Sequence, residues 1–175
     1  LEPSQQQLNT LLEHYKAKRY VDVEKLSISI TQEFPEHPFA WKALAVVLKL
    51  TGRLNESLVA NQKSAQLNPE DAEIHNNLSI TFQELSRFDE SEASCRQAIT
   101  LKPDYAEAHY NLGNTLKELG RLDEAETIYR QAITLKPDFI KAHNNLSITL
   151  LELDRFDESE ASCRQAITIK PNFAE

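Results

Sequence analysis

Three histidines recur at one spacing and raise the question of a metal site. His75, His109 and His143 are 34 residues apart, and imidazole nitrogens are common zinc ligands. The ligands of one zinc ion, however, all lie about 2 Å from it. A chain of stacked 34-residue units would hold equivalent residues several ångströms too far apart for that. We therefore expect no metal and no cofactor, and we assign the histidines a packing role.

Arginines recur at the same spacing and could form a row of anion sites. Acidic residues such as Asp89 and Asp123 lie close to them in the sequence. Exposed pairs of arginine and carboxylate are usually local and contribute little. We therefore interpret these arginines as turn residues that bond local carbonyls and neighbouring acids. The series comprises Arg19, Arg53, Arg87, Arg121 and Arg155.

Paired carboxylates also recur, an arrangement that glycosidases use for catalysis. Glycosidase carboxylates are about 5–9.5 Å apart around a concave site. The pairs in this chain instead begin predicted helices, where the helix dipole stabilises a carboxylate. They are Asp89/Glu90, Asp123/Glu124 and Asp157/Glu158. The sequence has no GxSxG motif, Gly-rich phosphate loop, HExxH motif or CxxC pair. We expect no catalysis by these residues, although a longer parent protein could be an enzyme.

Proline sets the same 34-residue period along the whole chain. It lacks a backbone donor and interrupts helices, so a stop at fixed spacing indicates one structural unit copied several times. The prolines are Pro35, Pro69, Pro103, Pro137 and Pro171. Cutting after the turn that follows each gives the units 4–37, 38–71, 72–105, 106–139 and 140–173. Residues 174–175 match the start of unit 106–139, so we expect a single array over 1–175 with a truncated sixth copy, cut from a longer protein.

Each unit reads as two amphipathic helices. In unit 106–139, Ala108, Leu112 and Leu116 are four residues apart, as on one face of a helix. Gly120 permits the turn to the second helix because glycine tolerates positive φ. The pattern predicts an all-α protein, an α-solenoid of antiparallel helix pairs. Unit 4–37 keeps this pattern least well, which is typical of a capping repeat.

The unit resembles the tetratricopeptide repeat (TPR), a helix pair of 34 residues. The positions that carry the resemblance are His109, Leu112, Gly113, Leu116, Ala125, Tyr129, Ala132 and Pro137. The resemblance covers nearly the whole chain. It implies a right-handed superhelix whose first helices line a concave groove that binds proteins or peptides.

Two of the repeats depart from this pattern at the same places. Ser79 and Ser147 replace the glycine, and Cys95 and Cys163 replace the aromatic residue of the second helix. The cysteines lie two units apart, too far for the Cα separation of about 4.4–6.8 Å that a disulfide requires. We expect both to be buried free thiols.

Asparagines recur just before the core leucine of three first helices. Asn77, Asn111 and Asn145 need an explanation because asparagine is a mediocre helix former. The resemblance places this position in the groove, where an amide can both donate to and accept from a peptide backbone. The row looks like the asparagine ladder of O-linked N-acetylglucosamine transferases, which share the motif Asn-Leu-Gly-Asn-x-Leu-Lys-Glu of residues 111–118. The alternative is that these asparagines are inherited with the repeat sequence and lie on a solvated helix face without a binding role.

Further groove positions are expected one turn away on the first helices. Their mixed character suits a peptide better than a metabolite, since pockets for small molecules are enclosed and mostly apolar. The predicted residues are Lys42, Val46, Lys49, Asn76, Ile80, Gln83, Tyr110, Asn114, Lys117, Asn144, Ile148 and Leu151.

The charge balance limits the partners. A net charge of −8 argues against nucleic acids and anionic membranes, which attract basic surfaces. No apolar run approaches the roughly 20 residues that cross a bilayer, and we expect a cytoplasmic location. The leading hypothesis is a scaffold that binds a protein or extended peptide. The alternatives are a substrate-recruiting arm of a larger glycosyltransferase or sulfotransferase, and end-to-end self-association through an apolar end face with Leu150, Leu153 and Ile167.

Overall fold

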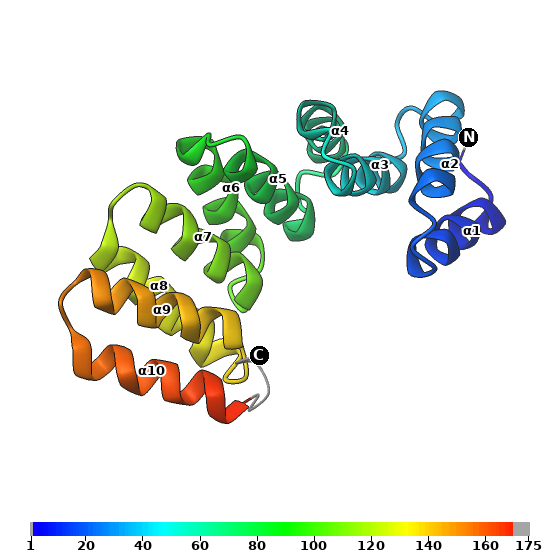
Figure 1. Ribbon diagram of the computed structural model, residues 1–175. Coiled ribbons are helices and arrows are strands. Elements are labelled where there is room, and N and C mark those ends of the chain that lie inside the picture. The colour runs from blue at the N-terminus through cyan, green and yellow to red at the C-terminus, as the bar shows by residue number, and fades with distance from the viewer. Residues whose placement is uncertain (1, 170–175) are drawn as a thin grey trace. The chain divides into compact units, whose positions relative to one another are not determined.

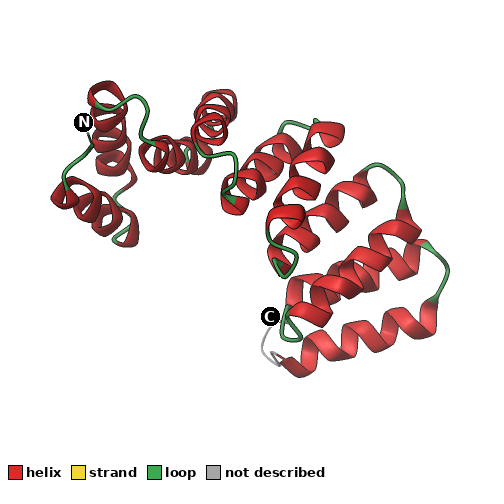
Figure 2. Ribbon diagram, turned by 180° about the vertical axis from the view of Figure 1, so that it is seen from behind, coloured by secondary structure: helices red, strands yellow, loops and turns green. Residues whose placement is uncertain are grey.

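The computed structural model describes residues 2–169, which form ten α-helices and no strand (Figures 1 and 2). The helices are α1 (Gln5–Lys16), α2 (Tyr20–Glu33), α3 (Pro38–Leu50), α4 (Leu54–Leu67), α5 (Ala72–Glu84), α6 (Phe88–Leu101), α7 (Ala106–Glu118), α8 (Leu122–Leu135), α9 (Ile140–Glu152) and α10 (Phe156–Ile169). Each predicted unit contributes one pair. None of the helices in this range is long and apolar enough to cross a membrane.

The helices fall into two compact units. Unit 1 spans residues 1–85 and holds α1 to α5, and unit 2 spans residues 86–175 and holds α6 to α10. Within each unit every helix packs on the next one along the chain, as Figure 1 shows for α7 to α10. The odd-numbered helices, called first helices below, also meet one another, α3 with α5 and α7 with α9. The predicted all-α solenoid of helix pairs is confirmed.

The turn inside each pair has the same backbone in all five repeats. One residue adopts a left-handed conformation, with φ between 56° and 78°. Only two repeats use glycine there, the residue that adopts this conformation without strain. The five turn residues are Lys18, Gly52, Ser86, Gly120 and Asp154. The turn geometry therefore belongs to the repeat and does not depend on glycine.

The turn between pairs is held by the bulky residue of the following first helix. Its ring N–H donates to the carbonyl of the proline six residues earlier, at 2.7–3.0 Å. The pairs are Trp41 with Pro35, His75 with Pro69, His109 with Pro103, and His143 with Pro137. The histidines have the packing role that the sequence predicts. Residues 2–169 contain no cluster of His, Cys, Asp or Glu that could hold a metal ion.

Two expectations for the last repeat are wrong. Leu150, predicted on an exposed end face, is fully buried in the core of unit 2, because α9 lies between α8 and α10. Cys163, predicted to be buried, is exposed, whereas Cys95 is buried. Cys95 packs against leucines of α7, while α10 packs on α9 alone among the described helices. Ile167 is exposed as predicted, and Leu153 is partly buried.

Gly113 allows α7 and α8 to approach each other closely. A Cβ atom at this position would lie 2.5 Å from Cε1 and 2.7 Å from Cδ1 of Tyr129. The ring cannot move aside, because Tyr129 is fully buried and its hydroxyl donates to Oδ1 of Asn114 at 2.8 Å. The repeats with serine at this place have cysteine in place of tyrosine. Glycine with tyrosine and serine with cysteine are thus two compatible solutions for one contact.

We expect Gly113→Ser to lower the free energy of unfolding by about 1–3 kcal/mol, because the added side chain overpacks the tyrosine ring. The double variant Gly113→Ser/Tyr129→Cys should lose less than the two single variants together. Urea unfolding of the four proteins in a double-mutant cycle measures this coupling. Strictly additive losses would contradict the proposed compensation.

Candidate functional site

Helices α7, α8 and α9 of unit 2 carry a hydrogen-bonded group of four side chains, called the Asn–Tyr network below. Nδ2 of Asn145 on α9 donates to Oδ1 of Asn114 on α7 at 2.7 Å and to the hydroxyl of Tyr110 at 3.3 Å. The hydroxyl of Tyr129 on α8 donates to the same oxygen of Asn114. Asn114 therefore joins three helices and is the centre of the network.

The network fixes the orientation of two amides. Because Oδ1 of Asn114 accepts two hydrogen bonds, the carbonyl side of this amide must face Tyr129 and Asn145. Burial raises the pKa of Tyr129 well above its usual range, which keeps the hydroxyl protonated as a donor. The amide nitrogen of Asn145 is occupied, whereas its Oδ1 has no hydrogen bond with another described residue. Asn145 is thus oriented to offer an acceptor.

Aromatic contacts support the network. The ring of Tyr110 lies 6.1 Å from that of Tyr129 and 4.9 Å from that of Phe139, at tilts of 47° and 43°. Tilted aromatic pairs at such distances are favourable. Phe139 immediately precedes α9, so these contacts also link α7 to the turn that leads into α9.

Unit 1 has a pocket of about 430 Å³ on its first helices. Its wall includes Leu12 of α1, Val46 of α3 and Asn77 of α5. Lys42 also lines the pocket, and its Nζ is 3.1 Å from Oδ2 of Asp71 and 2.5 Å from Oε2 of Glu73. Burial lowers the pKa of Lys42, but the hydrogen bonds from the two carboxylates outweigh it and raise that pKa overall. The positive charge of this predicted groove lysine is therefore already compensated by two carboxylates.

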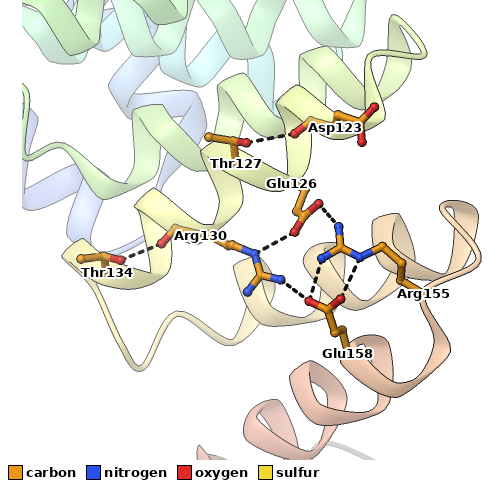
Figure 3. A network of polar contacts seen from close by, with 7 residues as sticks. All are labelled: Asp123, Glu126, Thr127, Arg130, Thr134, Arg155 and Glu158. Atoms are coloured by element: carbon orange, nitrogen blue, oxygen red, sulfur yellow. Dashed lines mark hydrogen bonds and ion pairs between the residues drawn. The ribbon is translucent and has the colours of Figure 1, made fainter.

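Four of the five recurring arginines bind glutamates on the second helices instead of forming open anion sites, whereas Arg19 makes no ion pair within residues 2–169. Arg121 lies 2.7 Å from Glu124, three residues on, and 2.6 Å from Glu92 on α6. Figure 3 shows the same arrangement between α8 and α10, where Arg155 bonds both Glu158 and Glu126. The partners are local acids, as predicted, although they are glutamates and not Asp89 or Asp123.

A second arginine completes the cluster in Figure 3. Arg130 lies 2.9 Å from both Glu126 of its own helix and Glu158 of α10. Burial raises the pKa of Glu126, but hydrogen bonds from Arg130 and Arg155 outweigh it and hold that pKa below its usual range. The two arginines and two glutamates fasten adjacent repeats together on the side of the second helices.

The family follows from sequence comparison. Two tetratricopeptide repeat models match the chain, one over residues 70–138 and the other over residues 110–172. Together they span more than half of it. The chain belongs to the tetratricopeptide repeat family. A comparison with curated protein sequences found no match.

Solved TPR structures share the fold across nearly the whole chain. MamA from Desulfovibrio magneticus RS-1 aligns with a TM-score of 0.86 and 13% identity, covering 97% of this chain and 96% of that chain. YrrB, described as a TPR protein with an unusual peptide-binding site, aligns with a TM-score of 0.78 and 16% identity. The alignment covers 98% of this chain and 88% of that chain. TTC0263, a thermophilic TPR protein of Thermus thermophilus, aligns with a TM-score of 0.78 and 24% identity. The alignment covers 97% of this chain and 92% of that chain.

The predicted binding residues all lie on first helices of the TPR array, but their surroundings differ. Asn76 and Asn111 are buried, with exposed fractions of 6% and 8%, and Ile148 is exposed. The partly buried residues are Lys42, Asn77, Ile80, Tyr110, Asn114, Lys117, Asn144 and Asn145. Asn77 belongs to unit 1, whereas Asn111 and Asn145 belong to unit 2. A continuous asparagine row therefore stays a prediction.

Sequence reasoning missed Tyr129 as part of the Asn–Tyr network. The repeat pattern predicts a core aromatic there, and the residue is fully buried, yet its hydroxyl reaches Asn114. A signal was present in the sequence. Asn114 accompanies Tyr129 in one repeat, whereas Ile80 and Ile148 stand at the same place in the two repeats with cysteine.

The cluster of Figure 3 predicts a pH dependence of stability. A carboxylate whose pKa is lowered by folding stabilises the fold above its unfolded pKa, near 4.3 for glutamate, and loses this effect as the pH falls through the folded value. We expect Glu126→Gln to cost about 0.5–1 kcal/mol at pH 7 and less at pH 3, where part of the wild-type carboxylate is protonated. Thermal unfolding at both pH values tests this. Glu160→Gln, which removes an exposed pair with Arg164, should have a smaller effect at pH 7.

Removing the tyrosine hydroxyl should loosen the Asn–Tyr network. We expect Tyr129→Phe to lower the free energy of unfolding by about 0.5–1.5 kcal/mol, because Asn114 loses one of its two donors. The side-chain amide signals of Asn114 and Asn145 should shift in NMR spectra. Tyr20→Phe in unit 1 is the control and should leave these signals in place. Unmoved amide signals in Tyr129→Phe would show that the hydrogen bond is not formed.

Proposed function

We propose that this chain is a non-catalytic scaffold that holds an extended peptide along its first helices. The observation that carries the proposal is the orientation of Asn145. Its nitrogen is bound within the Asn–Tyr network, and its Oδ1 has no partner in the described part of the chain. An acceptor fixed in this way suits a peptide N–H, whatever the side chain of that peptide residue.

The charges on the first helices favour recognition of the peptide backbone. Lys42 is paired with Asp71 and Glu73, and Nζ of Lys117 lies 3.3 Å from Oε1 of Glu152. These two predicted groove lysines are thus compensated by acids. In unit 2 the ligand would therefore be bound by hydrogen bonds with asparagines and by contact with exposed apolar residues such as Ile148.

The comparisons support the proposal at the level of the family. Tetratricopeptide repeats are helix pairs whose stacking creates extended concave surfaces, and YrrB is described as having a peptide-binding site. The same surface would serve a substrate-recruiting arm of a longer protein, and we keep this role as part of the proposal.

The asparagines can be tested with peptides selected from a random library for binding to the whole chain. We expect Asn145→Ala to weaken binding about three- to tenfold, the effect of one lost hydrogen bond. The variant Asn77→Ala/Asn111→Ala/Asn145→Ala should lose more. Asn55→Ala on α4, an exposed site on a second helix, is the control. Unchanged affinity in the triple variant, measured by fluorescence anisotropy, would rule out the proposed role of these residues.

A further inference from the structure

A pocket of about 520 Å³ lies between the second helices α8 and α10 of unit 2 and is called the second-helix pocket below. Its apolar lining comprises Ile133 of α8, Leu146 of α9 and Ala161 of α10. Leu146 and His143, both on α9, line the pocket and are buried, with exposed fractions of 3% and 8%, so they form its floor. The pocket is therefore built by three helices of one compact unit.

Two small residues of α10 contribute space to this pocket. Ala161 and Ser162 line it, whereas Thr127 and Ile128 stand at the equivalent places of the preceding repeat. Ile128 packs against the hydrophobic core of unit 2. A serine is too short to fill the same volume, so part of the groove between α8 and α10 stays open.

His143 supplies this pocket with a hydrogen-bond acceptor. Its Nε2–H donates to the carbonyl oxygen of Pro137 at 3.0 Å, so Nδ1 of the neutral ring is an acceptor. This nitrogen makes no hydrogen bond with another described residue, although buried polar groups normally have a partner. The equivalent nitrogen of His109 is also without a partner but is completely buried, whereas His143 lines a pocket. A donor on a bound ligand can therefore complete the hydrogen bonds of His143.

The charges at the edge of the pocket compensate each other. Arg130 and Glu158 both line it, and the guanidinium of Arg130 lies 2.9 Å from the carboxylate of Glu158 (Figure 3). The hydroxyl of Ser162 and the amide of Gln165 line it as well, and neither forms a hydrogen bond with another side chain or backbone group of residues 2–169. An apolar floor with uncharged polar groups and a closed ion pair favours a neutral ligand over a charged one.

The opening of the pocket favours a side chain of a polypeptide over a free small molecule. Thr134, Ala161 and Gln165 line the pocket and are exposed, whereas sites for small molecules enclose most of their ligand. Tryptophan often anchors protein interfaces by filling a pocket. Its indole is neutral and apolar and carries a single N–H donor, which matches the acceptor of His143.

We propose that the second-helix pocket binds a tryptophan side chain of a polypeptide partner, whose indole N–H donates to Nδ1 of His143. The ring packs on Ile133 and Leu146, and the partner's backbone lies along the exposed residues of α8 and α10. The inference goes beyond the proposed function, which uses the first helices. It gives the scaffold a second contact of different chemistry.

Four synthetic ligands test the chemistry. Acetyl-Gly-Trp-Gly-amide supplies the ring and the donor, its benzothienylalanine version has sulfur in place of the indole N–H, its alanine version lacks the ring, and free indole lacks the polypeptide. Binding to the whole chain is followed by NMR titration of the Leu146 methyl groups and the ring nitrogens of His143. We expect the Trp peptide to bind about three- to tenfold more tightly than the benzothienylalanine peptide, the effect of one lost hydrogen bond, and at least about tenfold more tightly than the alanine peptide. Free indole, which has no backbone to bond the helices, should bind at least about threefold more weakly than the Trp peptide.

Variants assign the effect to the pocket. Ala161→Thr/Ser162→Ile introduces the residues of the preceding repeat, so it should fold, and it should remove the shifts that the Trp peptide causes. The control Ala93→Thr/Ser94→Ile makes the same changes at the equivalent places of α6, outside the pocket, and should preserve them. Circular dichroism checks the fold of each variant.

The outcomes separate this inference from the proposed function. Equal affinity for the Trp and benzothienylalanine peptides, or undiminished shifts in Ala161→Thr/Ser162→Ile, would overturn it. Free indole that binds as tightly as the Trp peptide would assign the pocket to a small molecule and overturn it as well. The variant Asn77→Ala/Asn111→Ala/Asn145→Ala should bind the Trp peptide unchanged, because its substitutions lie on first helices, and a weaker His143 response there would contradict a separate site. If the Trp peptide does not bind at all, the pocket proposal fails, and the scaffold proposal is judged by the library-selected peptides alone.

Discussion

Every helix pair in this chain depends on the next helix to cover its apolar stripe. A single pair cannot bury that stripe alone, so repeats are stable only when they stack. The consequence is visible where two copies share one sequence. Cys95 and Cys163 occupy the same place in almost identical helices, yet Cys95 is buried under α7 and Cys163 is exposed. Burial here is set by the position in the stack and not by the residue.

The same constraint explains why the repeats hold together at two further places. Between pairs, a ring N–H of the first helix bonds a proline carbonyl at the preceding turn. On the second helices, arginines connect glutamates of adjacent repeats. Most of the recurring histidines, arginines and glutamates therefore serve to join neighbouring copies.

That surface is not uniform along the array. Unit 2 presents an ordered polar network centred on Asn114, whereas unit 1 presents a pocket with a largely apolar wall. The difference arises from a few substitutions within a constant backbone, such as Leu50 in place of the glutamate of the later repeats. One repeat architecture can thus present two chemically distinct surfaces on its first helices.

The sequence by itself determined the period, the helix pairs and the structural role of the histidines, because these follow from local stops and apolar spacing that every copy repeats. It could also place Asn77, Asn111 and Asn145 on first helices. Only the tertiary structure decided which groups remain available. Pairing of Lys42 with Asp71 and Glu73, burial of Asn111, and the hydrogen bonds that orient Asn145 all depend on residues of neighbouring helices. The pairings of Lys42 and Asn145 join positions 29, 31 and 35 residues apart, so no local pattern reports them.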